Sequence, residues 1–345
     1  LVGSEMCIRD RRYSSFMLAL PLLIGLSACS DDDQPKQEVS NNAVRFNVTV
    51  PRASKAATTT ASIDHFRIFS FVNSNPYMSN VVAKRTNSAW TTTPVMYWPA
   101  DDAPVNFYCI SPMVGEPEGT QVPNPNIGDY ENTDGRTDLL YSVTTGATVN
   151  PVGLNFRHAL SKVAFNFKRK TASDQQAPLK VDVKEVVVTA INGTASFTFP
   201  DKTTSPDAEA SGTWHDYKSL GDVTVFSGST ATLSDTYEAL NSTGYEFAIP
   251  QVLPESKSDL SGAYVKVLCS IYDETSGVKI WPKGADDAYL YFPLSSPGAS
   301  NTTSTWKIGK AYAYNITIGV PVGSGKIDFD VTVDEYPSFE DMYLE

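Results

Sequence analysis

The sequence predicts an all-β protein built from β-sandwiches. The 345 residues include 17 Tyr, 16 Phe and 5 Trp, and aromatic residues, like β-branched ones, are enriched in strands. From residue 43 onward, short segments that alternate apolar and polar residues are separated by clusters of Pro, Gly, Asn and Ser. No long segment keeps a helical spacing of apolar residues without a breaker. Many short strands joined by frequent turns are typical of sandwiches.

Charge and composition disfavour several classes of function. The chain carries 27 Lys and Arg against 39 Asp and Glu, which gives a formal net charge of −12. A protein that tracks a phosphate backbone needs a basic surface, so we expect no nucleic-acid partner. The 3 His and 4 Cys are few ligands for a zinc or haem site, and we expect neither a metal nor a cofactor.

Residues 1–28 predict an export signal. Residues 16–26 form an apolar run after Arg11 and Arg12. As a helix this run is about 16 Å long, roughly half the thickness of the hydrocarbon core of a bilayer, so it predicts a signal peptide rather than a membrane anchor. Residues 1–10 do not fit the charged start of a signal, and they are left out of the fold argument.

The signal ends in Leu26-Ser27-Ala28-Cys29, which resembles the lipobox of bacterial lipoproteins. The resemblance implies cleavage before Cys29 and acylation of that residue, for example by palmitate; several acyl chains hold a protein on a membrane where one does not. A plain secretory signal followed by a chance Cys is the alternative. Residues 29–42 are acidic and polar. Their acidic start resembles the surface-export signal of some outer-membrane lipoproteins, and we interpret them as a solvated tether.

Alternation of apolar and polar residues predicts nine strands in the rest of the chain. They cover residues 44–50, 66–71, 105–110, 163–167, 181–190, 194–199, 264–272, 312–318 and 327–333. Residues 158–167 also fit a helical spacing, and we interpret them as a short turn that runs into a strand. Residues 112–135 are rich in Pro, Gly and Asn and predict a long surface loop.

Two domains are expected after the tether. An N-terminal β-sandwich covers residues 43–153, and a C-terminal β-sandwich with the terminal strand covers residues 154–345. The boundary follows a turn at residues 146–153, beyond which strand density resumes, and each part is long enough to bury its own core. Cys109 and Cys269 then fall in different domains, each in an apolar strand. We expect buried free thiols, with a disulfide as the alternative.

Four segments together resemble the fimbrillin-like lipoproteins of outer-membrane bacteria, which are major and minor subunits of an adhesive pilus. The most specific, LNFRHALSKV, occupies residues 154–163; MYWP (96–99), FAIPQ (247–251) and WKIGKAYAY (306–314) match the family in order and spacing. The resemblance implies two transthyretin-like β-sandwich domains in tandem and a role in assembling or decorating pili. Residues 333–336 depart from the family because they lack the Trp often found after the last strand.

The polar residues of these segments predict structural roles. His158 lies near Ser161 and Lys162, but no nucleophile with a base and an orienting group accompanies it. We therefore expect a hydrogen-bonded His at the domain junction and no catalysis. Tyr312 and Tyr314 lie on one face of a predicted strand, and both are expected to pack inward.

The first and last predicted strands carry the same apolar pattern. The first reads VRFNVTV (44–50) and the last reads IDFDVTV (327–333). Two segments with the same side chains on one face can fill the same groove, which is the requirement for donor-strand exchange, in which a neighbour's strand replaces a subunit's own. The alternative is that terminal strands of sandwiches often look alike. The residues expected to exchange are Val44, Phe46, Val48 and Val50 against Ile327, Phe329, Val331 and Val333.

Release of the first strand requires a cut after it. Residues 51–60 are small and polar, which makes them a suitable protease target. The family resemblance implies cleavage after a basic residue by a trypsin-like protease. Arg52, or Lys55, is therefore the expected processing site.

These observations predict a surface lipoprotein of the cell outer membrane without enzyme activity. We expect a structural subunit, or an accessory or tip component, of a pilus that mediates adhesion. Its expected partners are other pilus subunits or copies of itself, the outer membrane through the lipid anchor, and the processing protease; a host glycan or protein is a further candidate. The alternative is a surface lipoprotein that binds a glycan or host protein and never polymerises.

Overall fold

The computed structural model describes residues 42–49, 63–87, 89–112, 126–132, 134–171, 178–201, 203, 212–284, 286–296, 303–320 and 329–335, the last range for its backbone only. The chain divides into two units, residues 1–40 and 41–345, and all of the described residues lie in the second. There, every regular element is a β-strand, which confirms the predicted all-β class. In the same part of the chain, no helix is long and apolar enough to cross a membrane.

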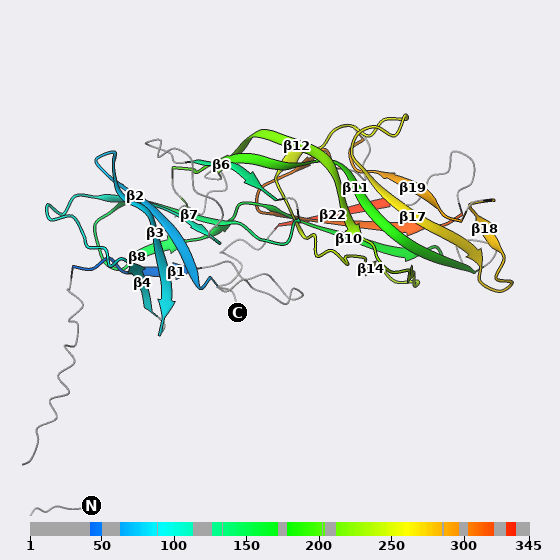
Figure 1. The fold of residues 1–345 in the computed structure, drawn as a ribbon, viewed down its shortest axis with the longest axis horizontal. Coiled ribbons are helices and arrows are strands. Elements are labelled where there is room, and N and C mark those ends of the chain that lie inside the picture. The colour runs from blue at the N-terminus through cyan, green and yellow to red at the C-terminus, as the bar shows by residue number, and fades with distance from the viewer. Residues whose placement is uncertain are drawn as a thin grey trace, which may run out of the picture. The chain divides into compact units, whose positions relative to one another are not determined.

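The first half of the described chain forms an eight-stranded sheet, here called the N-terminal sheet, in the order β8-β1-β4-β3-β2-β5-β7-β9. Figure 1 labels β1, β2, β3, β4, β7 and β8 among its strands. Strands from opposite ends of the sheet, β8 and β7, bury Leu154 and Leu140 in one apolar cluster, so the sheet curves round this N-terminal core. The strands are β1 (Phe46–Thr49), β2 (His65–Val72), β3 (Asn75–Thr86), β4 (Ala89–Thr93), β5 (Val105–Ser111), β7 (Leu140–Ala147), β8 (Val152–Asn155) and β9 (Arg157–His158).

Two further sheets enclose the C-terminal core as a sandwich. One has the order β14-β10-β21-β22 with β15 beside β10; the other has the order β12-β11-β17-β18, with β6 and β13 beside β11 and β19 beside β17. Alternate residues of both sheets, such as Phe165, Tyr314, Val183 and Val267, meet in this core. The strands are β6 (Asn126–Glu131), β10 (Ser161–Arg169), β11 (Leu179–Thr198), β12 (Thr213–Phe226), β13 (Ala231–Thr232), β14 (Glu238–Ala239), β15 (Phe247–Ala248), β17 (Tyr264–Asp273), β18 (Lys279–Trp281), β19 (Ala288–Pro293), β21 (Lys310–Ile318) and β22 (Phe329–Glu335), and β16 (Gln251–Val252) pairs separately with β20 (Thr305–Trp306).

A third apolar cluster connects the N-terminal sheet to β6, β11 and β12. In it the ring of Tyr141 packs against that of Phe197 at 4.9 Å between centroids, and Phe197 packs against Trp214 at 5.0 Å. The strand β5 is therefore buried on both faces: Phe107 belongs to the N-terminal core and Tyr108 to this junction cluster. A strand buried on both faces reads as a nearly continuous apolar run, as residues 105–110 do.

The predicted strands appear in the structure, with one fusion. Residues 181–190 and 194–199 belong to the single strand β11. It continues through an irregularity at which Ala190 has φ 58° and the register with β12 shifts between Val188 and Ile191. A bulge of this kind breaks the period of two that sequence patterns rely on, which is why one strand looked like two.

The expectation of a continuous surface loop over residues 112–135 was wrong. The strand β6 lies inside it, with Ile127 and Tyr130 buried in the junction cluster. The register between β6 and β11 shifts between Ala195 and Phe197, so the two buried residues of β6 lie three positions apart instead of two. No alternation is left in the sequence to reveal the strand.

The sheets do not part at residue 154. The strand β8 spans that position and pairs with β1, and β9 follows it in the same sheet. Leu154 and Phe156 are buried in the N-terminal core. In the other direction, β6 precedes residue 154 in the chain but pairs with β11. The chain thus crosses between the sheets twice before β10.

Candidate functional site

The strand β1, the first of the two strands with the same apolar pattern, lies second from the end of the N-terminal sheet. It runs parallel to the end strand β8, with Phe46 opposite Val152 and Thr49 opposite Asn155. On its other side it meets β4 antiparallel, with Phe46 opposite Trp90. The strand therefore fills a position between two neighbours, and we call the gap that it occupies the β1 groove.

Residues 42–45 lead directly into β1, and we call them the start of β1. The apolar side chains of this segment and of β1 face the N-terminal core. Val44 and Phe46 are 3% and 6% exposed, and Val48 is partly buried against the same cluster. The ring of Phe46 makes edge contacts with those of Phe66 and Phe107, both at 5.7 Å between centroids. The groove wall is formed by Phe66, Trp90, Phe107, Val152, Leu154 and Phe156.

The start of β1 is bonded on both sides. On the β4 side, the Val44 amide donates to the Met96 carbonyl at 2.8 Å, and the Asn42 carbonyl accepts from the Trp98 amide at 3.0 Å. On the β8 side, the side chain of Asn150 donates to the Ala43 carbonyl at 2.8 Å and accepts from the amide of Arg45 at 2.9 Å.

The last strand, β22, is the end strand of its sheet and pairs with β21 only, among the strands that the structure describes. Its register places Phe329, Val331 and Val333 opposite Ile316, Tyr314 and Tyr312, all three of which are buried. Because β1 and β22 belong to different sheets, the two matching strands do not pair within one copy of the chain.

The remaining predicted site residues lie outside the described residues. These are the lipidation residue Cys29, the processing residues Arg52 and Lys55, the last residue of the first predicted strand, Val50, and the first residue of the last predicted strand, Ile327. Their roles stay predictions.

The two tyrosines of β21 pack inward, as the sequence predicts. Tyr314 is fully buried and stacks on Phe165 at 5.2 Å between centroids. Its hydroxyl accepts a hydrogen bond from the indole nitrogen of Trp306 at 2.6 Å, and that of Tyr312 accepts from the amide of Lys307 at 2.8 Å. Burial raises the pKa of both hydroxyls, so both stay neutral.

His158 and its polar neighbours each have a structural partner. The Nδ1 atom of His158 lies 2.6 Å from an oxygen of the half-buried Asp138. The Ser161 hydroxyl donates to the carbonyl of Lys307 at 2.8 Å, and the Lys162 ammonium lies 3.9 Å from Glu246. A hydroxyl that is committed to a backbone carbonyl is not positioned as a nucleophile against the imidazole. The pair His158 and Asp138 fastens β9 to the loop before β7.

Cys109 and Cys269 are free thiols with no exposed surface, which confirms the predicted state. Burial raises the pKa of Cys109 well above its ordinary value. Burial, with the charge of Asp287, raises the pKa of Cys269 to about 12. Both thiols therefore stay protonated and pack as small apolar side chains. Within the described residues, no group of three or more His, Cys, Asp or Glu side chains could hold a metal ion.

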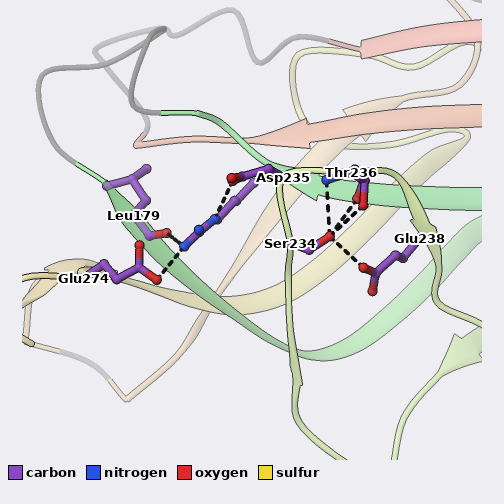
Figure 2. Close-up of polar contacts among 7 residues, drawn as sticks. Leu179, Ser234, Asp235, Thr236, Glu238 and Glu274 are labelled. Carbon is purple, nitrogen blue, oxygen red and sulfur yellow. Dashed lines mark hydrogen bonds and ion pairs between the residues drawn. The ribbon is translucent and has the colours of Figure 1, made fainter.

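A polar cluster that sequence reasoning missed lies at one end of the C-terminal sandwich (Figure 2). Arg169, at the end of β10, donates from Nε to Asp235 at 2.7 Å and from Nη1 to Glu274 at 2.8 Å and to the Leu179 carbonyl at 2.6 Å. Hydrogen bonds to Glu274 and Asp235 raise the pKa of the guanidinium. One side chain thus connects β10 of one sheet with β11 and the turn after β17 of the other.

The chain is similar in fold to a solved fimbrial protein. A search of curated proteins finds no match. Among solved structures, a fimbrial protein from Bacteroides vulgatus is 17% identical, with a TM-score of 0.59 over 86% of this chain and 100% of that one. A fimbrilin from Porphyromonas gingivalis is 9% identical, with a TM-score of 0.43 over 84% of this chain and 96% of that one.

A family profile gives the decisive match. The profile described as fimbrillin-like matches residues 48–335, which begin within β1 and end with β22. The match therefore covers every sheet described above. The chain belongs to the fimbrillin-like family.

Proposed function

We propose that this protein is a subunit, or an accessory or tip component, of a cell-surface pilus, and that it assembles by donor-strand exchange. In this proposal the protein is anchored to the outer membrane through acylated Cys29, and a trypsin-like protease cuts after Arg52 or Lys55. The cut frees β1, and the last strand of another subunit or copy enters the β1 groove. Membership of the fimbrillin-like family supports a fimbrial or adhesion-related protein at the cell surface.

The observation that carries the proposal is the position of β1. The strand is short, yet Val44, Phe46 and Val48 contribute to the N-terminal core. At roughly 1.5–3 kcal/mol for each fully buried side chain, Val44 and Phe46 supply on the order of 3–6 kcal/mol before ordering costs, and the partly buried Val48 adds a smaller share. Removal of β1 would leave an apolar groove between β8 and β4, and such a groove favours refilling by a strand of matching pattern.

The last strand has the properties of a donor. It lies at a sheet edge with a single described neighbour, so it can leave without breaking pairing on a second side. Its residues Phe329, Val331 and Val333 match Phe46, Val48 and Val50 in order and spacing. The two strands also belong to separate sheets, so a match between them is useful only between copies.

Cleavage of the purified mature protein with an Arg-specific protease tests the proposal. We expect a ladder of oligomers on a gel run without boiling, together with loss of residues 29–52 by mass spectrometry. The double variant Arg52→Gln, Lys55→Gln should stay uncut and monomeric. A chain that lacks residues 327–345 should be cut normally but form no ladder.

One outcome of the protease experiment would contradict the proposal. A stable monomer that has lost residues 29–52 would contradict donor-strand exchange. It would favour the alternative of a surface lipoprotein that binds a glycan or host protein without polymerising, whose ligand binding should survive deletion of residues 327–345.

A further inference from the structure

The side chain of Asn150 replaces one pair of main-chain hydrogen bonds in the ladder between β1 and β8. In a parallel ladder, the amide of Arg45 and the carbonyl of Ala43 would bond the main-chain O and N of residue 150. The strand β8 begins only at Val152, and the side chain of Asn150 takes both positions instead: Oδ1 accepts from Arg45 at 2.9 Å and Nδ2 donates to Ala43 at 2.8 Å. The carbonyl of Arg45 then accepts from the amide of Val152 at 2.8 Å, where the regular ladder starts.

The same end of the strand is also held from the β4 side. Ala43 forms an antiparallel bridge with Tyr97, and the Val44 amide donates to Met96 at 2.8 Å. Ala43 and Val44 are 4% and 3% exposed. The start of β1 is therefore buried and bonded on both of its edges.

The other end of β1 is held on one edge only, within the part of the chain that the structure describes. Among the described residues, the antiparallel ladder with β4 consists of the pair Phe46 and Trp90. The described pairing of Val48 and Thr49 is with β8 alone, and it ends where the Thr49 carbonyl accepts from the amide of Phe156 at 3.1 Å.

From its two hydrogen bonds to the backbone of Ala43 and Arg45 we infer that Asn150 is a retention clamp for the first strand. The strand comes away from its Thr49 end toward Asn42, and the Asn150 amide is the last hold on the β8 side. The amide bonds only backbone atoms, so its ligand is any extended strand in this register, whatever its side chains. The link to strand release depends on the proposed function, because the expected cut at Arg52 or Lys55 lies on the Thr49 side. The clamp itself is a property of the uncut chain.

Hydrogen exchange resolved to single amides on the uncut, full-length protein tests the clamp. In the wild type, we expect Val48 and Thr49 to exchange before Val44 and Arg45. In Asn150→Ala, the amides of Val44 and Arg45 should exchange about tenfold faster, since two hydrogen bonds to the strand are lost. Asn150→Asp keeps the acceptor for Arg45 and loses the donor to Ala43, so its effect should be smaller.

A matched control separates the clamp from a general loss of stability. Asn106 lies in β5 of the same sheet, and its side chain accepts from the amide of Gly146 at 2.7 Å. Asn106→Ala should leave the exchange of β1 unchanged. Exchange of β17 amides in the C-terminal sandwich reports whether each variant is folded, and it should be the same in all of them.

Two results would overturn the inference. One is that Asn150→Ala and Asn106→Ala change β1 exchange equally; the other is that the whole of β1 exchanges as one unit in the wild type. Both exchange measurements use the uncut protein, so they test the clamp even if the protein never polymerises. Where the protease does release β1, Asn150→Ala should also lose the cut strand about tenfold faster. An unchanged rate of loss would contradict the role in release.

Discussion

The strands β10 and β1 each lie beside a parallel neighbour, and they are held very differently. The strand β10 pairs with β21 from Lys162 to Arg169 and has β14 and β15 on its other edge. It ends at the polar cluster around Arg169. The strand β1 pairs with β8 over the four residues Phe46 to Thr49, and a neutral side-chain amide continues the ladder. The proposed function requires such a difference, because in it β10 stays in place and β1 leaves.

The contrast extends to what each strand buries. Three residues of β10 belong to the C-terminal core, and their partners on β21 are buried with them. Loss of β10 would break a sheet in the middle. Loss of β1 would uncover one groove near the end of the N-terminal sheet and would leave the end strand β8 without its described ladder partner. We therefore expect the same type of substitution to unfold the molecule in one case and only loosen a strand in the other.

The largest effect is expected from Phe165→Ala in β10. Phe165 is 2% exposed and stacks on Tyr314, so truncation should lower the free energy of unfolding by about 3–5 kcal/mol. Urea unfolding followed by tryptophan fluorescence measures this loss. Lys162→Ala on the same strand removes a 3.9 Å ion pair with Glu246 and should change stability by less than about 1 kcal/mol. Equal losses for the two variants would contradict the assignment of β10 to the core.

The matching change in the first strand is Phe46→Ala. Phe46 packs against Phe66 and Phe107, and its truncation should weaken the hold on β1 by about 3 kcal/mol. The loss should be local: hydrogen exchange of β1 accelerates while that of β17 does not. Asn47→Ala is the control, because Asn47 is exposed. Global unfolding of Phe46→Ala at the concentration of urea that unfolds Phe165→Ala would show that β1 is not separable.

A smaller effect is expected from Arg169→Ala, which breaks the cluster at the end of β10. Asp235 and Glu274 are half exposed and regain water, so the loss should be about 1–2 kcal/mol. Arg169→Lys should recover only part of it, since an ammonium cannot reproduce the fork of the guanidinium. Thermal unfolding of the three proteins measures the order. Full recovery by Lys would show that charge alone, without the fork geometry, holds this end of the sandwich.

The sequence predicts most readily the strands in which buried and exposed residues alternate with a period of two. A period of two survives in strands with one buried face, such as β10 and β21, and these were found. It fails in β12, where seven consecutive residues, 216–222, are exposed at a sheet edge. Such a strand exists because β11 pairs with it, and nothing in its own sequence reports that neighbour.

The candidate site was predictable in part for the same reason. The apolar positions Val44, Phe46 and Val48 follow from alternation, and all three contribute to the core. The amide of Asn150 lies 105 residues from Arg45 in the chain, and an Asn before a Pro reads as a turn. Its role depends on where β8 begins, which only the tertiary structure reveals.

The smallest effect expected is a difference in pH dependence between the C-terminal sandwich and the contacts that hold β1. In the C-terminal sandwich, the hydrogen bond from Lys184 and then that from Ser270 lower the pKa of Asp287. A carboxyl whose pKa is lower in the folded state stabilises the fold above its unfolded pKa of about 3.9, and this stability is lost as the pH falls through the folded value. The contacts of β1 with Asn150, Met96 and Trp98 are neutral, so acid should not weaken them.

Urea unfolding of the C-terminal sandwich should therefore shift to lower urea between pH 6 and pH 3, and less so in Asp287→Asn. The protection of β1 amides, corrected for the intrinsic exchange rate at each pH, should stay constant over the same range. If protection of β1 falls with pH in parallel with the sandwich, the two strands are coupled, and β1 is held by the stability of the whole molecule instead of by its own neutral contacts.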